Sequence, residues 1–414
     1  MWKPEPAFRL AARGDVVESV MGSKQQSSRL VFVGDDGDVY EASGGRKPKR
    51  LTWGWTDGPT QERLQYVWPS YSPNGEHVAC FGVQAGNGDT AGLYAVTDDG
   101  VSMHEIWKMD GAVPICENWS ADSAYIALLL QDGQRLRLDI ADIAKPGKAL
   151  ALDSGSPLFW SWSPAGNLIA VHTSGSRSVY SEARLCVFDV DDGAEEVARL
   201  VPGEFRTPAW SPDGKKLAYI DASGPREFLA FFHVDDGVSE IVCPVEGHTV
   251  MLWSPDGSRL AVSQALGDTP HMFTGITMID TRSGRTEVVS DRNVVSFFWS
   301  PCSRRLVSVA LDEGRGMEWD FFDVRGMRTT LDTRFYPSRE SVYFCWFFDQ
   351  FATSHPLISP DGDSLVFTGH LEQDHGSNGA SGVYVAPLDG DGSVTRLASG
   401  QFACWDTRLR ACSD

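Results

Sequence analysis

The 414-residue sequence contains no run of 18 apolar residues, and no apolar segment follows its early lysine, Lys3. These absences argue against a membrane-spanning helix and against a secretory leader. None of the eight cysteines belongs to a Cys-x-x-Cys pair, and most of them stand in apolar, strand-like runs. Such cysteines are typical of small buried hydrophobes in a reducing compartment, which predicts a cytoplasmic location.

Positive charge is scarce, with 36 Lys and Arg against 56 Asp and Glu and a net charge of −20. An acidic surface repels phosphate backbones and anionic lipid, so neither a nucleic-acid partner nor a membrane is expected. The sequence also lacks a Gly-x-Ser-x-Gly nucleophile motif, a His-Glu-x-x-His zinc motif and a calcium loop of the EF-hand type. These missing motifs leave no recognisable catalytic centre.

One phrase recurs along the chain, in which an anchor residue precedes Ser-Pro-Asp-Gly or a close variant and then an apolar run. The anchors are Tyr71, Trp119, Trp162, Trp210, Trp253, Trp299 and Ile358, with an eighth aromatic anchor at Trp405. By subtraction of these numbers, successive anchors are 43 to 59 residues apart. A period in the forties is the length of one four-stranded propeller blade, so the repeat predicts an all-β propeller with antiparallel blades.

The chemistry of the phrase supports this interpretation. A tryptophan that ends one strand can bury a large ring between neighbouring sheets. In the turn that follows, Pro presets φ, Asp bonds its own backbone and Gly adopts positive φ. The next run, such as Lys216 to Ile220, is rich in residues that favour strands.

The number of second strands gives the blade count. They begin near Arg29, His77, Ala124, Leu168, Lys216, Arg259, Arg305 and Ser364, which predicts eight blades. The first of them lacks a preceding anchor strand, and the strand around Trp405 lacks a second strand after it. We therefore expect blade one to be closed by both ends of the chain, which removes free sheet edges. The predicted domains are an extension (1–28), one propeller (29–407) and a tail (408–414).

The repeated Trp-Ser-Pro-Asp-Gly motif resembles the TolB-like propeller repeat, whose blades also occur in relatives of dipeptidyl peptidase IV and prolyl oligopeptidase. The resemblance covers Arg29 to Thr407. Those peptidases add an α/β-hydrolase domain, and TolB itself is periplasmic with an extra N-terminal domain. Because neither domain is expected here, the resemblance implies the fold and does not imply peptidase activity.

In the family's topology, loops between blades and between second and third strands share one face, which we call the top face. The Ser-Pro-Asp-Gly turns share the other, the bottom face. The bottom face collects acids that suit either turn chemistry, which the Asp-Gly pattern favours, or a surface for Ca²⁺ or a basic partner. These acids include Asp122, Asp213, Asp256 and Asp361.

The longest insertion, residues 332–356, precedes the last Ser-Pro-Asp-Gly turn and is expected on the top face, with the longer segments 54–65, 173–183, 265–274 and 370–381. It is unusually aromatic, with Phe335, Tyr336, Tyr343, Phe344, Trp346, Phe347, Phe348 and Phe351. A solvated loop would not carry so many aromatic residues. The insertion is therefore either a structural plug over the ring or the wall of a ligand pocket.

Polar residues in this insertion and at the entries to first strands could converge on a central funnel. The ligand-binding candidates are Glu117, Arg206, His248, Asn293, Arg339, Trp346, Asp349, Gln350 and His355. Asp349 and His355 are also the candidate catalytic residues, although each polar group taken alone is more often a satisfied structural one. Ser354 and His355 are adjacent, so on a strand they would point to opposite faces and could not form a dyad. The scattered histidines lack metal-ligand spacing, so no metal and no other cofactor is expected.

Two functions remain open. The first is a binding or scaffold propeller that recognises a peptide, protein or small ligand at the top face. The alternative is a stand-alone propeller enzyme, a lyase, hydrolase or cyclase, that acts on an apolar or aromatic metabolite in the funnel. An ordered ligand in the funnel would favour the enzyme, and a purified complex would favour the scaffold.

Overall fold

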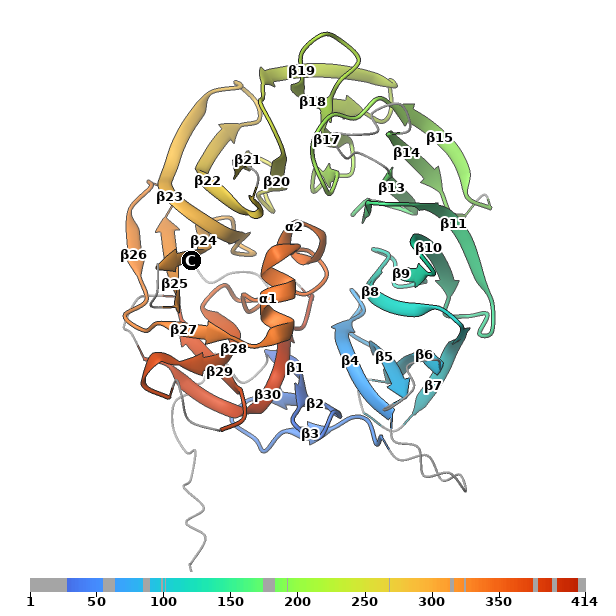
Figure 1. Cartoon of the computed structure of the whole chain (residues 1–414), viewed down its shortest axis with the longest axis vertical. Coiled ribbons are helices and arrows are strands. Elements are labelled where there is room, and N and C mark those ends of the chain that lie inside the picture. Colours follow the sequence, from blue (N-terminus) through green and yellow to red (C-terminus); the bar gives the residue numbers. More distant parts are fainter. Residues whose placement is uncertain are drawn as a thin grey trace, which may run out of the picture.

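The computed structural model describes residues 28–54, 64–84, 90–97, 100, 102–173, 183–191, 193–267, 269–312, 316–323, 325–374, 379–388 and 393–408. Most of the predicted extension and tail, and much of the top-face segments 54–65 and 173–183, lie outside these residues. The described strands form sheets arranged around a central axis, as a propeller requires (Figure 1). None of the helices within the described residues is long and apolar enough to cross a membrane.

Four of the sheets have four antiparallel strands each, with neighbours in sequence paired. Their strands are β4 (Leu64–Tyr71), β5 (His77–Gln84), β6 (Thr90–Thr97) and β7 (Met103–Asp110); β8 (Val113–Trp119), β9 (Tyr125–Asp132), β10 (Arg135–Asp142) and β11 (Ala149–Gly155); β12 (Leu158–Trp162), β13 (Leu168–Thr173), β14 (Arg184–Asp189) and β15 (Glu195–Leu200); and β16 (Ala209–Trp210), β17 (Lys216–Asp221), β18 (Phe228–His233) and β19 (Val238–Pro244).

The remaining 14 described strands form one continuous sheet. They are β20 (Thr249–Trp253), β21 (Arg259–Leu266), β22 (Thr269–Asp280), β23 (Thr286–Trp299), β24 (Arg305–Asp312), β25 (Gly316–Asp323), β26 (Arg328–Thr330), β27 (Phe335–Pro337), β28 (Ser364–Leu371), β29 (Gly382–Pro387), β30 (Thr395–Trp405), β1 (Arg29–Gly34), β2 (Val39–Ser43) and β3 (Lys49–Arg50). The predicted antiparallel propeller is confirmed. The count of eight blades stays a prediction, because this sheet is not divided into separate blades.

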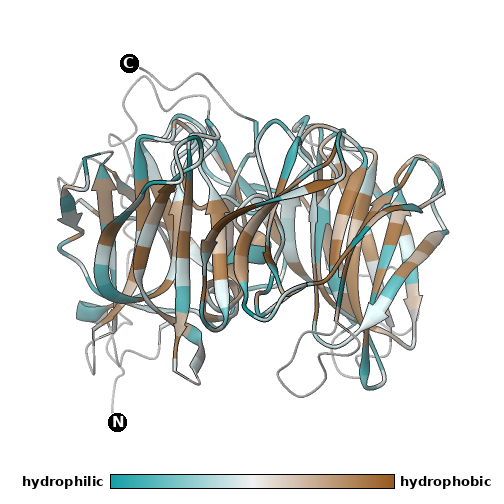
Figure 2. Cartoon of the chain, turned by 90° about the horizontal axis from the view of Figure 1, so that it is seen from above, coloured by the Kyte–Doolittle hydropathy of each residue, from teal (hydrophilic) through white to brown (hydrophobic). Residues whose placement is uncertain are grey.

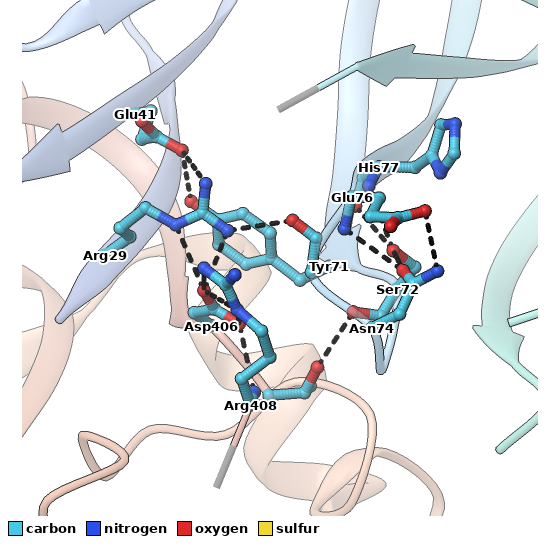
Figure 3. Close-up of polar contacts among 11 residues, drawn as sticks. Arg29, Glu41, Tyr71, Ser72, Asn74, Glu76, His77, Asp406 and Arg408 are labelled. Atoms are coloured by element: carbon cyan, nitrogen blue, oxygen red, sulfur yellow. Dashed lines mark hydrogen bonds and ion pairs between the residues drawn. The ribbon is translucent and has the colours of Figure 1, made fainter. Parts of the chain in front are cut away.

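The chain closes on itself through β1 and β30. These strands pair antiparallel, with Leu30 opposite Trp405 and Phe32 opposite Ala403. Figure 3 shows the polar contacts beside this seam, where Arg29 Nη2 donates to Asp406 Oδ2 (2.9 Å) and to the Gly75 carbonyl (2.9 Å). The sheet that contains both ends of the described chain is thereby tied to its neighbour, and the expected closure of blade one is confirmed.

The anchor tryptophans make a repeated contact between sheets. The indole Nε1 of Trp210 donates to the Ser161 carbonyl (3.0 Å), and that of Trp253 donates to the Ala209 carbonyl (2.9 Å). Each acceptor directly precedes the anchor tryptophan of the preceding sheet. The same contact joins Trp162 to Asn118 and Trp299 to Leu252. Each ring therefore contributes apolar burial and one hydrogen bond to the neighbouring blade.

The Ser-Pro-Asp-Gly turns use their polar side chains internally. Ser211 Oγ donates to Asp213 Oδ1 (2.6 Å), and the same carboxylate oxygen accepts from the Lys215 amide (3.1 Å). Gly214 has a φ of 68°, where a Cβ is strained. Hydrogen bonding to Ser211 lowers the pKa of Asp213. Matching contacts occur at Asp122, Asp256 and Asp361. These bottom-face acids therefore make the contacts that turn chemistry requires.

The insertion 332–356 folds into two helices, α1 (Arg339–Trp346) and α2 (Phe348–Phe351). Figure 1 shows both in the middle of the ring of sheets. Ser338 Oγ caps α1 by accepting from the Ser341 amide (3.1 Å). The insertion is thus a structural plug, one of the two alternatives that its aromatic composition allowed.

The plug packs through its aromatic rings. Phe344 stacks on Phe298 of β23, with centroids 5.7 Å apart, and Phe348 lies 4.7 Å from Phe297. Both plug residues are buried, as is Phe351. Figure 2 shows that hydrophobic residues are concentrated along the strands, between the two faces of the disc. The plug therefore extends the hydrophobic core into the centre of the ring.

Candidate binding face over the plug

Arg206 fixes the plug to the ring. It lies in the segment before β16 and is 3% exposed. Its Nη2 lies 2.5 Å from Asp349 Oδ1, its Nε donates to Asp349 Oδ2 (3.3 Å), and its Nη1 donates to the Trp346 carbonyl. Burial lowers the pKa of Arg206, and the charge of Asp349 opposes that shift. The carboxylate of Asp349 is therefore engaged as a buried counter-ion.

Gln350 makes a second attachment of α2. Its Oε1 accepts from the Trp160 amide (3.1 Å), and its Nε2 donates to the Trp160 carbonyl (2.8 Å). A neighbouring antiparallel strand would make the same two hydrogen bonds, one to the amide and one to the carbonyl of a residue in β12. Gln350 thus satisfies buried backbone groups of the innermost strand.

His355 is completely buried in an aromatic cage. Its ring lies 5.7 to 5.9 Å from those of Trp68, Phe351 and Phe402. Burial lowers the pKa of His355 to about 3, so the imidazole is neutral at physiological pH. The expectation that Ser354 and His355 point apart is wrong, because they lie in a turn after α2 and Ser354 Oγ is 2.8 Å from His355 Nδ1. Even so, this pair is sealed from solvent at the histidine.

Glu117 is buried away from the Arg206 pair. It lies on β8, and its Oε1 accepts from Ser70 Oγ of β4 (2.6 Å). Its Oε2 has no hydrogen-bond partner among the described residues. Burial raises the pKa of Glu117 to about 8, so the carboxyl is largely protonated at neutral pH.

The other predicted site residues lie in different surroundings. Asn293 is exposed on β23, opposite Thr274 of β22, and Arg339 is exposed at the first residue of α1. His248 is half-buried near Arg206, and burial with that positive charge lowers the pKa of His248 to about 4. The structure thus gathers Arg206, His248 and Asp349 with the plug, whereas Asn293 and Arg339 are surface residues. Whether any of them binds a ligand stays a prediction.

Trp346 is the exposed aromatic residue of the plug, at 40% exposure. Its ring stacks on His271 of β22, with centroids 4.7 Å apart and planes 12° from parallel. His271 was not among the predicted site residues, and neither was His172, whose Nδ1 lies 2.9 Å from the Arg206 carbonyl. His172 is the penultimate residue of the apolar strand β13, where nothing in the sequence distinguishes it from a core residue.

A groove on the same side was also missed. It has a volume of about 720 Å³ and is lined by Glu204, Arg226, Glu227 and the segment 244–247. These residues lie in the loop before β16 and in the loops between β17 and β18 and between β19 and β20. Burial and the charge of Glu204 raise the pKa of Glu227. The groove is therefore acidic, and it begins two residues from Arg206.

Comparisons with known proteins agree with the architecture. No family model matches the chain. The Tol-Pal system protein TolB of Hahella chejuensis is 36% identical over 81 residues, which is 19% of this chain and 18% of that protein. The β-propeller domain of the Trilobed protease from Pyrococcus furiosus is 13% identical, with a TM-score of 0.50 over 81% of this chain and 96% of that one. A eukaryotic initiation factor is 12% identical, with a TM-score of 0.52 over 92% and 99%. At these identities the solved structures support the fold alone.

Proposed function

We propose that this chain, a TolB-like β-propeller, is a cytoplasmic binding module that recognises a peptide, protein or small ligand on the face over its plug. The observation that carries the proposal is the exposure of Trp346. The plug's acid–base candidates, Asp349 and His355, are buried, and Asp349 is engaged by Arg206. Contact with a partner is therefore available at this face, whereas proton transfer by these two groups is not.

An exposed tryptophan on a fixed support suits recognition. Trp346 is held from below by the bond from Arg206 to its carbonyl and from the side by the ring of His271. Preorganised aromatic side chains bury much area at little entropic cost, and tryptophan is enriched at binding hot spots. The groove beside Glu204 gives the same side a concave surface that a ligand could enter.

The test compares two exposed tryptophans. Trp346→Ala and Trp53→Ala each remove one exposed indole, but Trp53 lies after β3, outside the plug. Native mass spectrometry of the protein purified from its source would measure any retained small molecule or subunit. We expect the retained mass to be lost with Trp346→Ala and kept with Trp53→Ala. Retention in both variants would place binding elsewhere.

The alternative, a stand-alone enzyme, draws on the groove. Glu227 lines it and has a pKa raised by burial and by Glu204, as a general acid would need. The plug occupies the funnel in which that activity was expected, so we assign this alternative to the groove. If a retained molecule is converted on incubation with the protein, Glu227→Gln should abolish the conversion while leaving retention intact.

A further inference from the structure

Three histidines surround the contact that holds the plug. We call this contact the latch; it consists of Arg206, Asp349 and the Trp346 carbonyl. His172 comes from β13, His248 precedes β20 and His271 lies on β22, so three histidines from separate segments of the ring each supply one imidazole. His172 lies 2.9 Å from the Arg206 carbonyl, and His271 stacks on Trp346. The latch is therefore enclosed by groups that can acquire positive charge.

The latch accommodates these histidines in their neutral form. The only hydrogen-bond partner of His172 among the described residues is a carbonyl at Nδ1, so Nδ1 carries the proton and Nε2 is a bare lone pair. Within the part of the chain that the structure describes, that Nε2 has no partner, and neither has His248 Nε2 or His271 Nδ1. A proton added at His172 would therefore lie in a buried space without an acceptor.

Neighbouring positive groups would oppose the protonation of these histidines. The positive charge of Arg206 disfavours protonation of His248 and of His271. In the same way, His248 disfavours charge on His172, and His271 disfavours charge on His248. Two carboxylates face them: Asp349, which favours charge on His248 and His271 but is engaged by Arg206, and Glu204, which favours charge on His248. Backbone contacts with Trp346 and Arg206 also favour charge on His271 and His172, and burial outweighs these contributions. Positive charge would thus accumulate around a guanidinium that already has its counter-ion.

We propose that these histidines make the latch sensitive to acid, so that their protonation releases α1 and α2 from the ring. Release would expose Phe344, Phe348 and Phe351, which are now buried, and would open the centre of the propeller. Binding at the plug face would then depend on pH, which goes beyond the proposed recognition role.

The direction follows from the protons bound in each state. Burial lowers the pKa of His172 and of His248 to about 4, against an ordinary value of 6.5. The closed latch therefore binds fewer protons than the released plug between these values, and closure weakens as the pH falls from 6.5 towards 4. Full titration of one such histidine shifts the equilibrium on the order of 100-fold towards release.

The test is hydrogen exchange, corrected for the intrinsic effect of pH, at pH 7.5 and pH 4.5. Residues 338–352 report on the plug, and β17 reports on the ring. We expect the plug to lose protection at least about tenfold at pH 4.5 while β17 keeps its own, because release precedes global unfolding. Equal protection of the plug at both pH values would overturn the proposal, as would simultaneous loss in plug and ring.

Variants sharpen this result. A triple variant, with His172→Asn, His248→Asn and His271→Asn, removes the three imidazoles that can gain a proton. The amide introduced by His172→Asn keeps a donor for the Arg206 carbonyl. His233→Asn is the control, since His233 lies on β18 beside Glu240. We expect the triple variant to keep its plug protected at pH 4.5 and the control to behave as the wild type. Acid release in the triple variant would overturn the proposal. The wild-type comparison of plug and ring decides the matter even if the triple variant does not fold.

Discussion

The bottom-face turns and the plug both provide hydrogen-bond partners for polar side chains, but they do so in different ways. In the turns, Ser211 and Asp213 satisfy each other and the backbone within a few residues of chain. In the plug, Arg206 and Asp349 satisfy each other across 143 residues. The first arrangement is local and repeated, whereas the second is distant and unique. In a repeat fold, contacts that depart from the repeat indicate positions that serve a function in addition to folding.

The largest expected effect on stability comes from removing the pairing of β1 with β30, which closes the ring. Deletion of residues 401–414 removes the part of β30 that pairs with β1 from Leu30 to Val33, together with Asp406 and Phe402. The exposed edge and lost burial should cost several kcal/mol, more than a single core truncation. Chemical denaturation would measure the loss. An unchanged denaturation midpoint would contradict the closure.

The next test compares one carboxylate from each region. Asp349→Ala should cost about 3–5 kcal/mol, because it leaves the Arg206 guanidinium buried without a counter-ion. Asp213→Ala, which removes only a turn contact, should cost about 1 kcal/mol. Asp349 is a candidate site residue from the sequence, and its burial against Arg206 predicts that it also contributes to stability. Similar losses in the two variants, measured by urea unfolding, would erase the contrast.

A third carboxyl, that of Glu117 on β8, is buried with no positively charged partner in the described part of the chain and differs in its protonation. The Ser70 contact does not compensate for burial at Glu117, so its folded pKa of about 8 exceeds its ordinary 4.5. The folded state then holds a proton that the unfolded state has lost, and stability falls as the pH rises from 4.5 to 8. Glu117→Gln should raise the free energy of unfolding by about 4 kcal/mol at pH 8.5 relative to its effect at pH 4.5, where it should change little. The exposed Glu195→Gln on β15 is the control. Equal effects of Glu117→Gln at both pH values would contradict a protonated Glu117.

A smaller effect on stability concerns the hydrogen bond in the repeated tryptophan contact. Trp210→Ala should cost roughly 3–5 kcal/mol through lost burial. Trp210→Phe keeps most of that burial and removes the bond to the Ser161 carbonyl, so it should cost about 1 kcal/mol beyond the lost area. Thermal unfolding of both variants would separate the two contributions. If Trp210→Phe unfolds at the same temperature as the wild type, the hydrogen bond contributes nothing to stability.

The sequence was sufficient where structure is periodic and insufficient where it is not. The anchors and turns predicted the strands, the antiparallel sheets and the pairing of β1 with β30, because each repeat confirms the others. The link between Arg206 and Asp349 has no period and no local pattern, so only the folded chain brings the two side chains together. The helices of the plug were not predicted, because the aromatic composition of residues 332–356 suits a plug and a pocket wall equally. His172 resembled an ordinary core residue of its strand, and the turn that brings Ser354 to His355 follows a helix that was not expected.

The most direct test of the central claim, that function lies over the plug and not on the bottom face, compares Trp346→Ala with Asp213→Ala. Native mass spectrometry would measure the retained ligand or subunit, and thermal unfolding would measure stability in the same samples. Our account predicts that Trp346→Ala keeps its stability within about 0.5 kcal/mol and loses the retained mass, because the exposed ring packs little of the core. It predicts that Asp213→Ala loses slight stability and keeps the retained mass. Loss of the mass with Asp213→Ala and its retention with Trp346→Ala would contradict the account.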